Sequence, residues 1–275
     1  MSAQFGGDQY IAGQKEPVID MPTRFVDFMR VLVPMAGDDT TPEGEQVNIY
    51  GNHVGSWNFA ATAYLNRWKV KIYYEHYFDD HSQMFFQYGR WKDGHIGLEI
   101  TFPKNRFIDT FVYEGLGTKD QTGPMLYDSF WGKFEEQISA KDNYYNHYLY
   151  QGWQHWGMGI GNPLLPGPIY NKNGQITFIS NRVLAHHIGF CGSPCQSLSY
   201  RMLLSYSRHW GTYDNPLNEI KKQFNSLFEV TYAPQQLKGW SFTVSGAMDR
   251  GNILGNNYGG MLVIRKQGII KSGNK

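Results

Sequence analysis

The sequence predicts an all-β fold, an antiparallel up-and-down β-barrel of the outer-membrane type. Apolar and polar residues alternate along residues 198–210 and again along 239–249. Side chains of a strand point to opposite faces with a period of two, so each stretch forms one apolar, aromatic-ended face and one polar face. Both stretches exceed the roughly 5–6 residues of ordinary strands and match the roughly 9–11 residues that cross a bilayer.

The composition is the second observation and fits a surface that faces lipid. Charged residues make up 18% of the 275 residues, below the roughly 25% of soluble domains, whereas aromatic residues reach 16%. Lys and Arg (25) nearly balance Asp and Glu (24), which gives no reason to expect a nucleic-acid partner. No run of about 20 apolar residues predicts a membrane-spanning helix. An aromatic-rich soluble β protein would share this composition.

The period-two pattern divides the chain into three parts. Residues 1–54 are expected to form an irregular segment, a barrel loop or plug with at most a short helix near 25–33. Residues 55–268 form the barrel portion, with about nine strands. Residues 269–275 are a tail. The expected strands cover residues 55–65, 68–75, 96–102, 107–114, 176–190, 196–210, 223–233, 239–249 and 258–267.

The connections between these strands are the third observation, because short and long ones alternate as in membrane barrels. The longest, residues 115–175, is expected to be partly helical, near 127–138, and to lie on the cell exterior; so long a connection is usually functional. An odd count of about nine strands points to part of a larger barrel. Short connections are expected at 66–67, 103–106, 191–195 and 234–238, and long ones at 79–93, 115–175, 211–222 and 250–257.

One set of apolar positions in the last strands is expected to face lipid, because each alternates with a polar or smaller neighbour. The set comprises Phe224, Phe228, Val230, Tyr232, Trp240, Phe242, Val244, Leu262 and Ile264.

Several segments give the sequence a family resemblance. They are residues 148–153 (YLYQGW), 160–164 (IGNPL), 181–189 (NRVLAHHIG), 198–201 (LSYR), 206–213 (YSRHWGTY) and 254–261 (LGNNYGGM). Together they resemble the C-terminal half of the Wzi-like capsule assembly proteins of Gram-negative outer membranes, over roughly residues 55–268.

The resemblance implies an outer-membrane β-barrel of about eighteen strands, of which this chain holds about half. Such proteins anchor or assemble capsular polysaccharide at the cell surface and are lectin-like rather than enzymatic. The implied partners are capsular polysaccharide and outer-membrane lipid, with no nucleic acid and no cofactor. The first five residues, Met1 to Phe5, predict no secretion signal, so we expect a fragment or a chain without its native start.

The aromatic residues of 115–175 are the candidate sugar contacts. Sugars present apolar C–H faces and a rim of hydroxyls, which aromatic faces beside amide and imidazole groups match. The alternative is that the rings pack the loop into the barrel mouth. The candidates are Trp131, Tyr144, Tyr145, Trp153 and Trp156.

Charged residues on the polar faces of the strands are expected to line the lumen and to pair with one another, because isolated charges in a narrow interior require partners. As a group they could also hold an acidic polysaccharide. They are Lys69, Lys71, Arg201, Asp249 and Arg265.

Two other functions remain open, a β-rich glycoside hydrolase and a porin-like channel. Hydrolysis needs two carboxylates flanking the scissile bond. Solvated or lumen-facing positions are the ordinary explanation for the candidates, so no catalytic residue is predicted. These candidates are Glu99, Asp109, Glu114, Glu135 and Glu136.

A pair of cysteines and a pair of histidines bear on disulfide formation and on metal binding. Cys191 and Cys195 could form a disulfide across a tight turn or remain two free thiols. Adjacent His186 and His187 point to opposite faces of a strand, so no metal site is expected.

Overall fold

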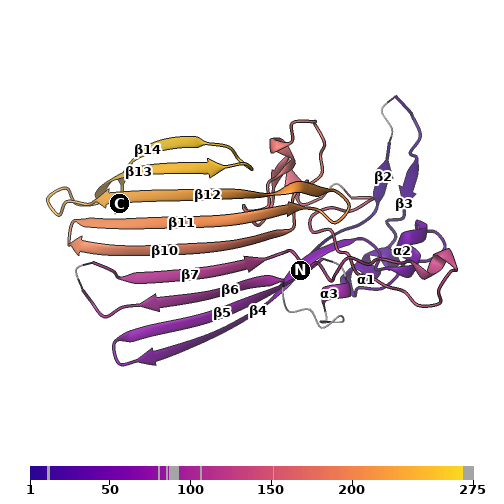
Figure 1. Cartoon of the computed structure of the whole chain (residues 1–275), viewed down its shortest axis with the longest axis horizontal. Coiled ribbons are helices and arrows are strands. Elements are labelled where there is room, and N and C mark those ends of the chain that lie inside the picture. The colour runs from indigo at the N-terminus through magenta and orange to yellow at the C-terminus, as the bar shows by residue number, and fades with distance from the viewer. Residues whose placement is uncertain are drawn as a thin grey trace, which may run out of the picture.

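The computed structural model describes residues 1–10, 13–79, 81–84, 86, 93–105, 107–150 and 152–268. It is an all-β fold built on one ten-stranded antiparallel sheet, in which each long strand pairs with the next along the chain (Figure 1). The predicted tail 269–275, Arg106 of the predicted 103–106 turn and most of the 79–93 connection lie outside the described residues.

Nine long strands form the sheet, as the sequence predicts, and the three-residue strand β1 (Ser2–Gln4) adds to one edge. The long strands are β4 (Asn52–Leu65), β5 (Trp68–Asp79), β6 (Gly94–Thr101), β7 (Thr110–Gly117), β10 (Val183–Cys195), β11 (Leu198–Gly211), β12 (Pro216–Tyr232), β13 (Trp240–Gly251) and β14 (Asn257–Lys266).

The remaining elements are short. They are the strands β2 (Gly7–Gln9), β3 (Ile19–Met21), β8 (Gln154–His155) and β9 (Met158–Gly159), the helices α1 (Phe25–Leu32), α2 (Glu43–Val47) and α3 (His81–Met84), and the 3-10 turns η1 (Ser129–Trp131) and η2 (Pro168–Tyr170). The expected helix near 25–33 is confirmed as α1. None of the helices within the described residues is long and apolar enough to span a bilayer.

The predicted alternation of connection lengths is wrong in the second half of the sheet. The 211–222 stretch is not a long loop, because β12 already begins at Pro216, and residue Gly211 pairs with it. The chain does not turn at 191–195, since β10 continues to Cys195 and the turn falls at 196–197. The 80–93 and 118–182 connections are long.

Two elements of the expected 115–175 loop also differ. Residues 127–138 form no α-helix: Gly132 adopts a left-handed φ of 68° directly after η1, and Tyr127 and Ile138 form a β-bridge instead. Residues 176–182 do not join β10. Asn181 there donates hydrogen bonds to the side chain of Asn143 and, at 2.8 Å, to the carbonyl of Tyr144, which hold it in the loop. We call residues 118–182 the excursion.

The strand register puts most of the apolar residues of the nine long strands on one face. Phe224, for example, lies opposite Tyr206, and Val244 lies opposite both Val230 and Leu262. The nine positions expected to face lipid therefore share this face, which we call the outer face. Its members include Phe59, Ala61, Ile72, Ile96, Leu98, Phe111, Tyr113, Ile188, Phe190, Met202, Leu204, Phe228, Val230, Phe242, Val244, Leu262 and Ile264.

Rings mark both ends of the outer face. Trp68, Tyr200, Tyr232 and Trp240 lie near the connections 66–67, 196–197 and 233–239. Trp57, Tyr74, Tyr206 and Tyr258 lie toward the opposite strand ends. Aliphatic and phenylalanine side chains occupy most of the band between the two groups of rings.

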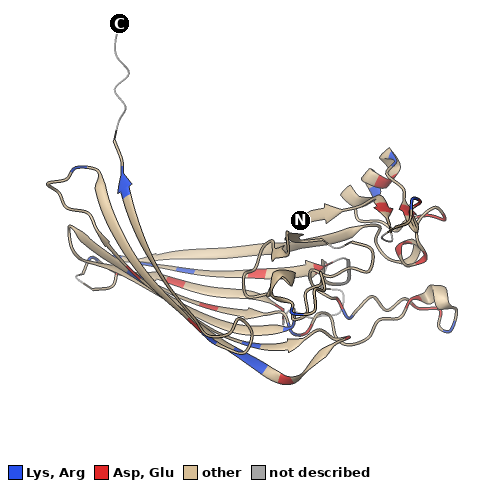
Figure 2. Ribbon diagram, turned by 90° about the horizontal axis from the view of Figure 1, so that it is seen from above, with Lys and Arg blue, Asp and Glu red and all other residues tan. Residues whose placement is uncertain are grey.

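The opposite face of the sheet, which we call the inner face, carries the polar residues and the excursion. In Figure 2 the sheet is curved, with the excursion on its concave side. A small apolar core of Leu116, Leu165, Phe178, Val183 and Ala185 joins the two. The excursion is therefore packed against the sheet rather than projecting from it.

A second contact joins the excursion to the N-terminal segment. Met21, Leu149 and Tyr150 are buried together, and the Gln9 side chain donates to the Leu149 carbonyl at 2.6 Å. His147 lies 3.6 Å from the Glu45 carboxylate. Burial lowers the pKa of His147 to about 4, so the ring meets Glu45 in its neutral form at neutral pH.

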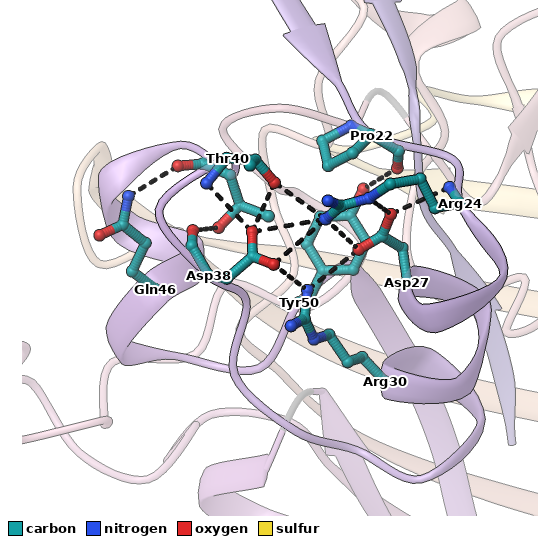
Figure 3. A network of polar contacts seen from close by, with 9 residues as sticks. Pro22, Arg24, Asp27, Arg30, Asp38, Thr40, Gln46 and Tyr50 are labelled. Carbon is teal, nitrogen blue, oxygen red and sulfur yellow. Dashed lines mark hydrogen bonds and ion pairs between the residues drawn. The ribbon is translucent and has the colours of Figure 1, made fainter.

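An ion-pair network holds the N-terminal segment itself (Figure 3). Arg24 and Arg30 both contact the fully buried carboxylate of Asp27, at 2.9 and 3.0 Å, and Arg30 also reaches Asp38 at 2.8 Å. Hydrogen bonds from Arg24 hold the pKa of Asp27 below its ordinary value. Tyr50 donates to the Pro22 carbonyl beside the network at 2.5 Å.

Replacing Asp27 by Ala is expected to destabilise α1 by about 2 kcal/mol, because it leaves two guanidinium groups without their shared buried acceptor. Hydrogen exchange of the α1 amides measures the effect. Asp39→Ala is the matched control, since Asp39 is exposed in the neighbouring loop. Equal exchange rates in the two variants would contradict a stabilising role for the network.

Candidate functional site

A cavity of about 760 Å³ lies between the inner face and the excursion. Its floor comes from β4–β7, β10 and β11, and its roof comes from residues 144–165. Small-molecule sites have volumes of roughly 300–1,000 Å³, so this cavity is large enough for a ligand. Ile160 and Gly161 on its lining are exposed, which shows that the cavity opens to solvent.

Neighbouring strands bring three ionisable side chains together on the floor. Glu75 of β5 lies directly across from His95 of β6, and Glu114 of β7 lies one diagonal step away. The His95 ring stands between the carboxylates, with Nδ1 3.8 Å from Glu75 and Nε2 3.5 Å from Glu114. Ser56 donates to Glu75 at 2.6 Å.

Tyr73 holds the Glu114 carboxylate in position through a hydrogen bond. Its hydroxyl donates to Glu114 Oε1, the oxygen that also faces His95. The Tyr73 ring lies over Gly97, where an added Cβ would come within 2.0 Å of the ring. Because a side chain at position 97 would displace the ring, glycine there permits the contact between Tyr73 and Glu114.

A second polar pair lies on the next strands. His187 of β10 contacts the Ser205 hydroxyl of β11 at 2.7 Å, and both line the cavity. His186, its neighbour, is on the outer face and contacts the Tyr113 hydroxyl at 2.8 Å. The two histidines point to opposite faces, as the sequence predicts, and no cluster of metal-ligating side chains occurs among the described residues.

Three of the five aromatic candidates meet at the cavity: Tyr144, Tyr145 and Trp153 all line it. Tyr145 is partly buried against the apolar core, and the Asn162 backbone N–H donates to its hydroxyl at 3.3 Å. Trp153 is only 8% exposed, and its indole N–H is buried without a hydrogen-bond partner among the described residues. A buried donor without a partner is costly, so the packing that buries the Trp153 ring offsets this cost.

The backbone around these rings is unusual. Tyr145, Trp153 and Trp156 have φ values of 68°, 57° and 52°, in the left-handed region that bulky residues rarely adopt. Such strained conformations are held only by surrounding structure and are concentrated at ligand sites. The excursion is therefore folded so as to fix these rings.

The other two candidates do not reach the cavity. Trp156 is 85% exposed, and Trp131 is 70% exposed in η1, which contacts α2 of the N-terminal segment. The structure therefore brings three of the five candidate rings together and leaves Trp131 and Trp156 apart from them. The excursion residues that are buried in the apolar core are Leu165 and Phe178. Neither Trp131 nor Trp156 belongs to that core.

Asp93, just before β6, fastens the excursion to the sheet. Its carboxylate accepts hydrogen bonds from the backbone N–H groups of Asp120 and Gln121, at 2.8 and 2.5 Å, and from the Tyr144 hydroxyl at 3.1 Å. Asp93 is nearly fully buried, and burial raises its pKa to about 6 despite these bonds.

The raised pKa predicts a pH-dependent excursion. The folded state binds a proton at Asp93 more readily than the unfolded state, so the stability of this contact is greatest below about pH 4 and falls as pH rises through about 6. The full loss is expected to be about 3 kcal/mol. Exchange of the Gln121 amide, corrected for its intrinsic pH dependence, measures it, and Asp93→Asn is expected to remove the dependence. A pH profile unchanged in Asp93→Asn would assign the effect elsewhere.

The five charged residues expected in the lumen all lie on the inner face of the sheet. Contrary to the prediction, they do not pair with one another, and three of them contact residues on neighbouring strands instead. Lys69 contacts Glu99 and Arg201 contacts Glu229, each at 3.2 Å, and Asn225 donates to Asp249 at 2.6 Å. Lys71 lies over the Tyr73 ring, and Arg265 is opposite Ser241.

Sequence reasoning missed most of the floor. The sequence identifies Glu114 as a candidate carboxylate. It does not identify Glu75, His95 or Tyr73, because nothing in the local pattern shows that three strands align them. The alternation itself was the available indication, since it puts all of them on polar positions. Cys191 and Cys195 are free thiols, which decides the alternative left open by the sequence.

Comparisons with models of known protein families and with curated protein sequences find no match to this chain.

Proposed function

We propose that this chain is part of an outer-membrane β-barrel that anchors or assembles capsular polysaccharide at the cell surface without chemistry. The observation that carries the proposal is the continuous outer face. Nine antiparallel strands place apolar side chains on one side, and Val244 there is 61% exposed. A band of aliphatic and phenylalanine side chains between two groups of tryptophan and tyrosine rings fits the hydrocarbon core and the two interfaces of a bilayer.

Lipid is the occupant that this face fits best. Soluble monomers rarely expose large contiguous apolar surfaces, and a protein partner would not need rings at both strand ends. Most strands are also long enough to cross, from 10 residues in β14 to 17 in β12. The polar inner face then lines the interior, as in known membrane barrels.

The excursion supports the second half of the proposal. It shares one end of the sheet with the 80–93 connection, and it presents aromatic rings and the Asn162 amide beside a solvent-open cavity. Saccharides are bound by such combinations of flat apolar faces and hydrogen-bonding groups. Because the excursion is packed on the inner face, it also obstructs the open water path that a porin requires.

One observation favours a second candidate, a glycoside hydrolase. Glu75 and Glu114 line the same cavity on either side of His95. Two carboxylates are the machinery of glycoside hydrolysis. Against it, Glu114 is already engaged by Tyr73 and His95 through one oxygen.

The test of the proposal uses the whole protein in its own cell. Trp131→Ala and Trp156→Ala together remove two exposed tryptophan rings of the excursion with little effect on packing. We expect normal insertion and a loss of surface-bound capsule. Phe25→Ala is the control, because Phe25 is equally exposed but lies in α1.

Unchanged capsule retention in the double variant would contradict the role of these rings. Free oligosaccharide that disappears in Glu75→Gln or Glu114→Gln would instead establish the hydrolase. Capsule lost without released oligosaccharide supports anchoring without chemistry.

A further inference from the structure

We propose that the outer face carries a binding site for the phosphate groups of a membrane lipid, at the end of the sheet where the excursion joins β7 and β10. This inference rests on the proposed function, since it names the lipid chemistry that the outer face meets at that end. Five cationic side chains form the site, which we call the cationic rim: Lys119, Arg182, Arg208, Lys222 and Arg250.

Neighbouring strands bring three members of the cationic rim together. Arg208 of β11 lies directly opposite Lys222 of β12. Arg250 of β13 is paired with Phe224, which puts it one diagonal step from Lys222 on the outer face. Directly opposite residues have Cβ atoms about 4.5–5.5 Å apart, and like charges in such positions destabilise a sheet. The strand register therefore holds side by side three positive charges that repel one another.

Two aromatic rings hold the other members beside them. Arg182 accepts a backbone hydrogen bond from Trp210 at 3.0 Å, and its guanidinium lies 3.8 Å from the centre of the Tyr213 ring. The Lys119 ammonium and the Arg208 guanidinium lie over the Trp210 ring, at 4.8 and 5.4 Å. A contact with a ring positions a cation without cancelling its charge. The rings thus gather cations at one place and leave them charged.

No carboxylate neutralises the cationic rim within the described part of the chain. None of its five members makes an ion pair there, whereas two cations of the inner face contact glutamates on neighbouring strands. Asp214, which follows Tyr213, is paired with Lys141. The paired stretches of the nine long strands, as far as they are described, place no Asp or Glu on the outer face. The charges of the rim are therefore available to an anion.

The position of the cationic rim along the strands matches the height of lipid phosphates. Arg208 lies two residues beyond Tyr206 toward the excursion, and Lys222 lies two residues beyond Phe224 in the same direction. Two residues of a strand span about 7 Å. Tyr206 belongs to the rings that mark this end of the outer face, and such rings lie at the interface of a bilayer. Groups just beyond them meet the lipid headgroups.

A phosphorylated lipid fits this surface better than an acidic polysaccharide does. None of the five rim residues lines the cavity under the excursion. The rim instead continues the apolar positions of β11–β13, so one lipid could place its phosphates on the rim and its acyl chains along Leu204 and Val230. Arginine and lysine both bind phosphate, arginine through two parallel hydrogen bonds. A polysaccharide would match only the charges.

The experiment is native mass spectrometry of the whole protein in a neutral detergent, titrated with four probes. They are lipid A with two phosphates, the same lipid with both phosphates removed, inorganic phosphate and a galacturonate trisaccharide. We expect the phosphorylated lipid to bind at least tenfold more tightly than each of the other three. Equal binding of the two lipids would overturn the recognition of phosphate. Binding of inorganic phosphate or of the trisaccharide as tight as that of the lipid would overturn the assignment to lipid.

Two variants locate the binding. Arg208→Gln and Lys222→Gln are each expected to weaken binding of the phosphorylated lipid about tenfold, because each removes a charge-assisted hydrogen bond. Each is also expected to raise the thermal midpoint in lipid-free detergent, because it removes a repulsive pair. A residue needed only for folding would lower that midpoint. Lys266→Gln is the matched control, since Lys266 lies over the outer-face ring of Trp240 at the opposite end of the sheet, and its affinity should stay unchanged.

Wild-type lipid affinity in both folded variants would show that the cationic rim is not the site. That result would leave the proposed function standing, because capsule retention is tested through Trp131 and Trp156. Conversely, normal capsule retention in those tryptophan variants, together with weakened lipid binding in Arg208→Gln and Lys222→Gln, would reject the role in capsule anchoring and keep the rim as a lipid site. Variants on two different strands keep the test decisive if one of them fails to fold.

Discussion

Replacing Val244 by Arg is expected to destabilise the membrane-inserted protein by about 2–4 kcal/mol, the cost of a guanidinium near the bilayer midplane. Val244 lies on the outer face within β13, opposite Val230 and Leu262, and is 61% exposed. Nothing in the sheet could shield a charge placed there. Denaturant titration of folding into detergent micelles or thin lipid vesicles measures the difference.

Ala247→Arg is the matched control for this prediction. Ala247 belongs to the same strand and is also exposed, but it lies on the inner face. An arginine there lies between Ser245 and Asp249 on the same face of the strand, so we expect a much smaller penalty. Equal penalties at the two positions would contradict the assignment of the outer face to lipid.

The second prediction with a large expected effect concerns the solubility of the chain without detergent or lipid. Without detergent or lipid, the chain is expected to aggregate, because its outer face is apolar and the edges of β14 and β4 are largely unpaired. Size-exclusion chromatography with light scattering, before and after detergent removal, measures this directly. A monodisperse preparation in plain buffer with a sharp thermal transition would mean that the outer face is covered by something other than lipid.

The strands could be predicted because period two is a local property. The alternation at 198–210 and 239–249 identified both β11 and β13 and their apolar sides. Strand ends were less accurate, as at β10 and β12, since pairing extends a strand through residues whose pattern is weak. Pro216 begins β12 because a neighbouring strand end supplies Gly211 as its partner.

The site could be predicted only in part, because it depends on residues far apart in the chain. Rings in 115–175 suggested a sugar contact, yet local sequence did not distinguish Trp153, which is buried against the sheet, from Trp156, which is not. The floor required the register of three strands. The helix predicted over 127–138 does not form for a local reason, because Gly132 adopts a left-handed conformation.

The register of β14 has a consequence for whatever completes the sheet. Within the described chain β14 pairs on one side only, with β13. A segment that pairs with its other side must present apolar side chains level with Leu262 and Ile264. It must present smaller or polar side chains level with Val263. A slip of one residue would turn every apolar group of that segment into the interior. The last strand is thus a template that any completing strand must match in phase.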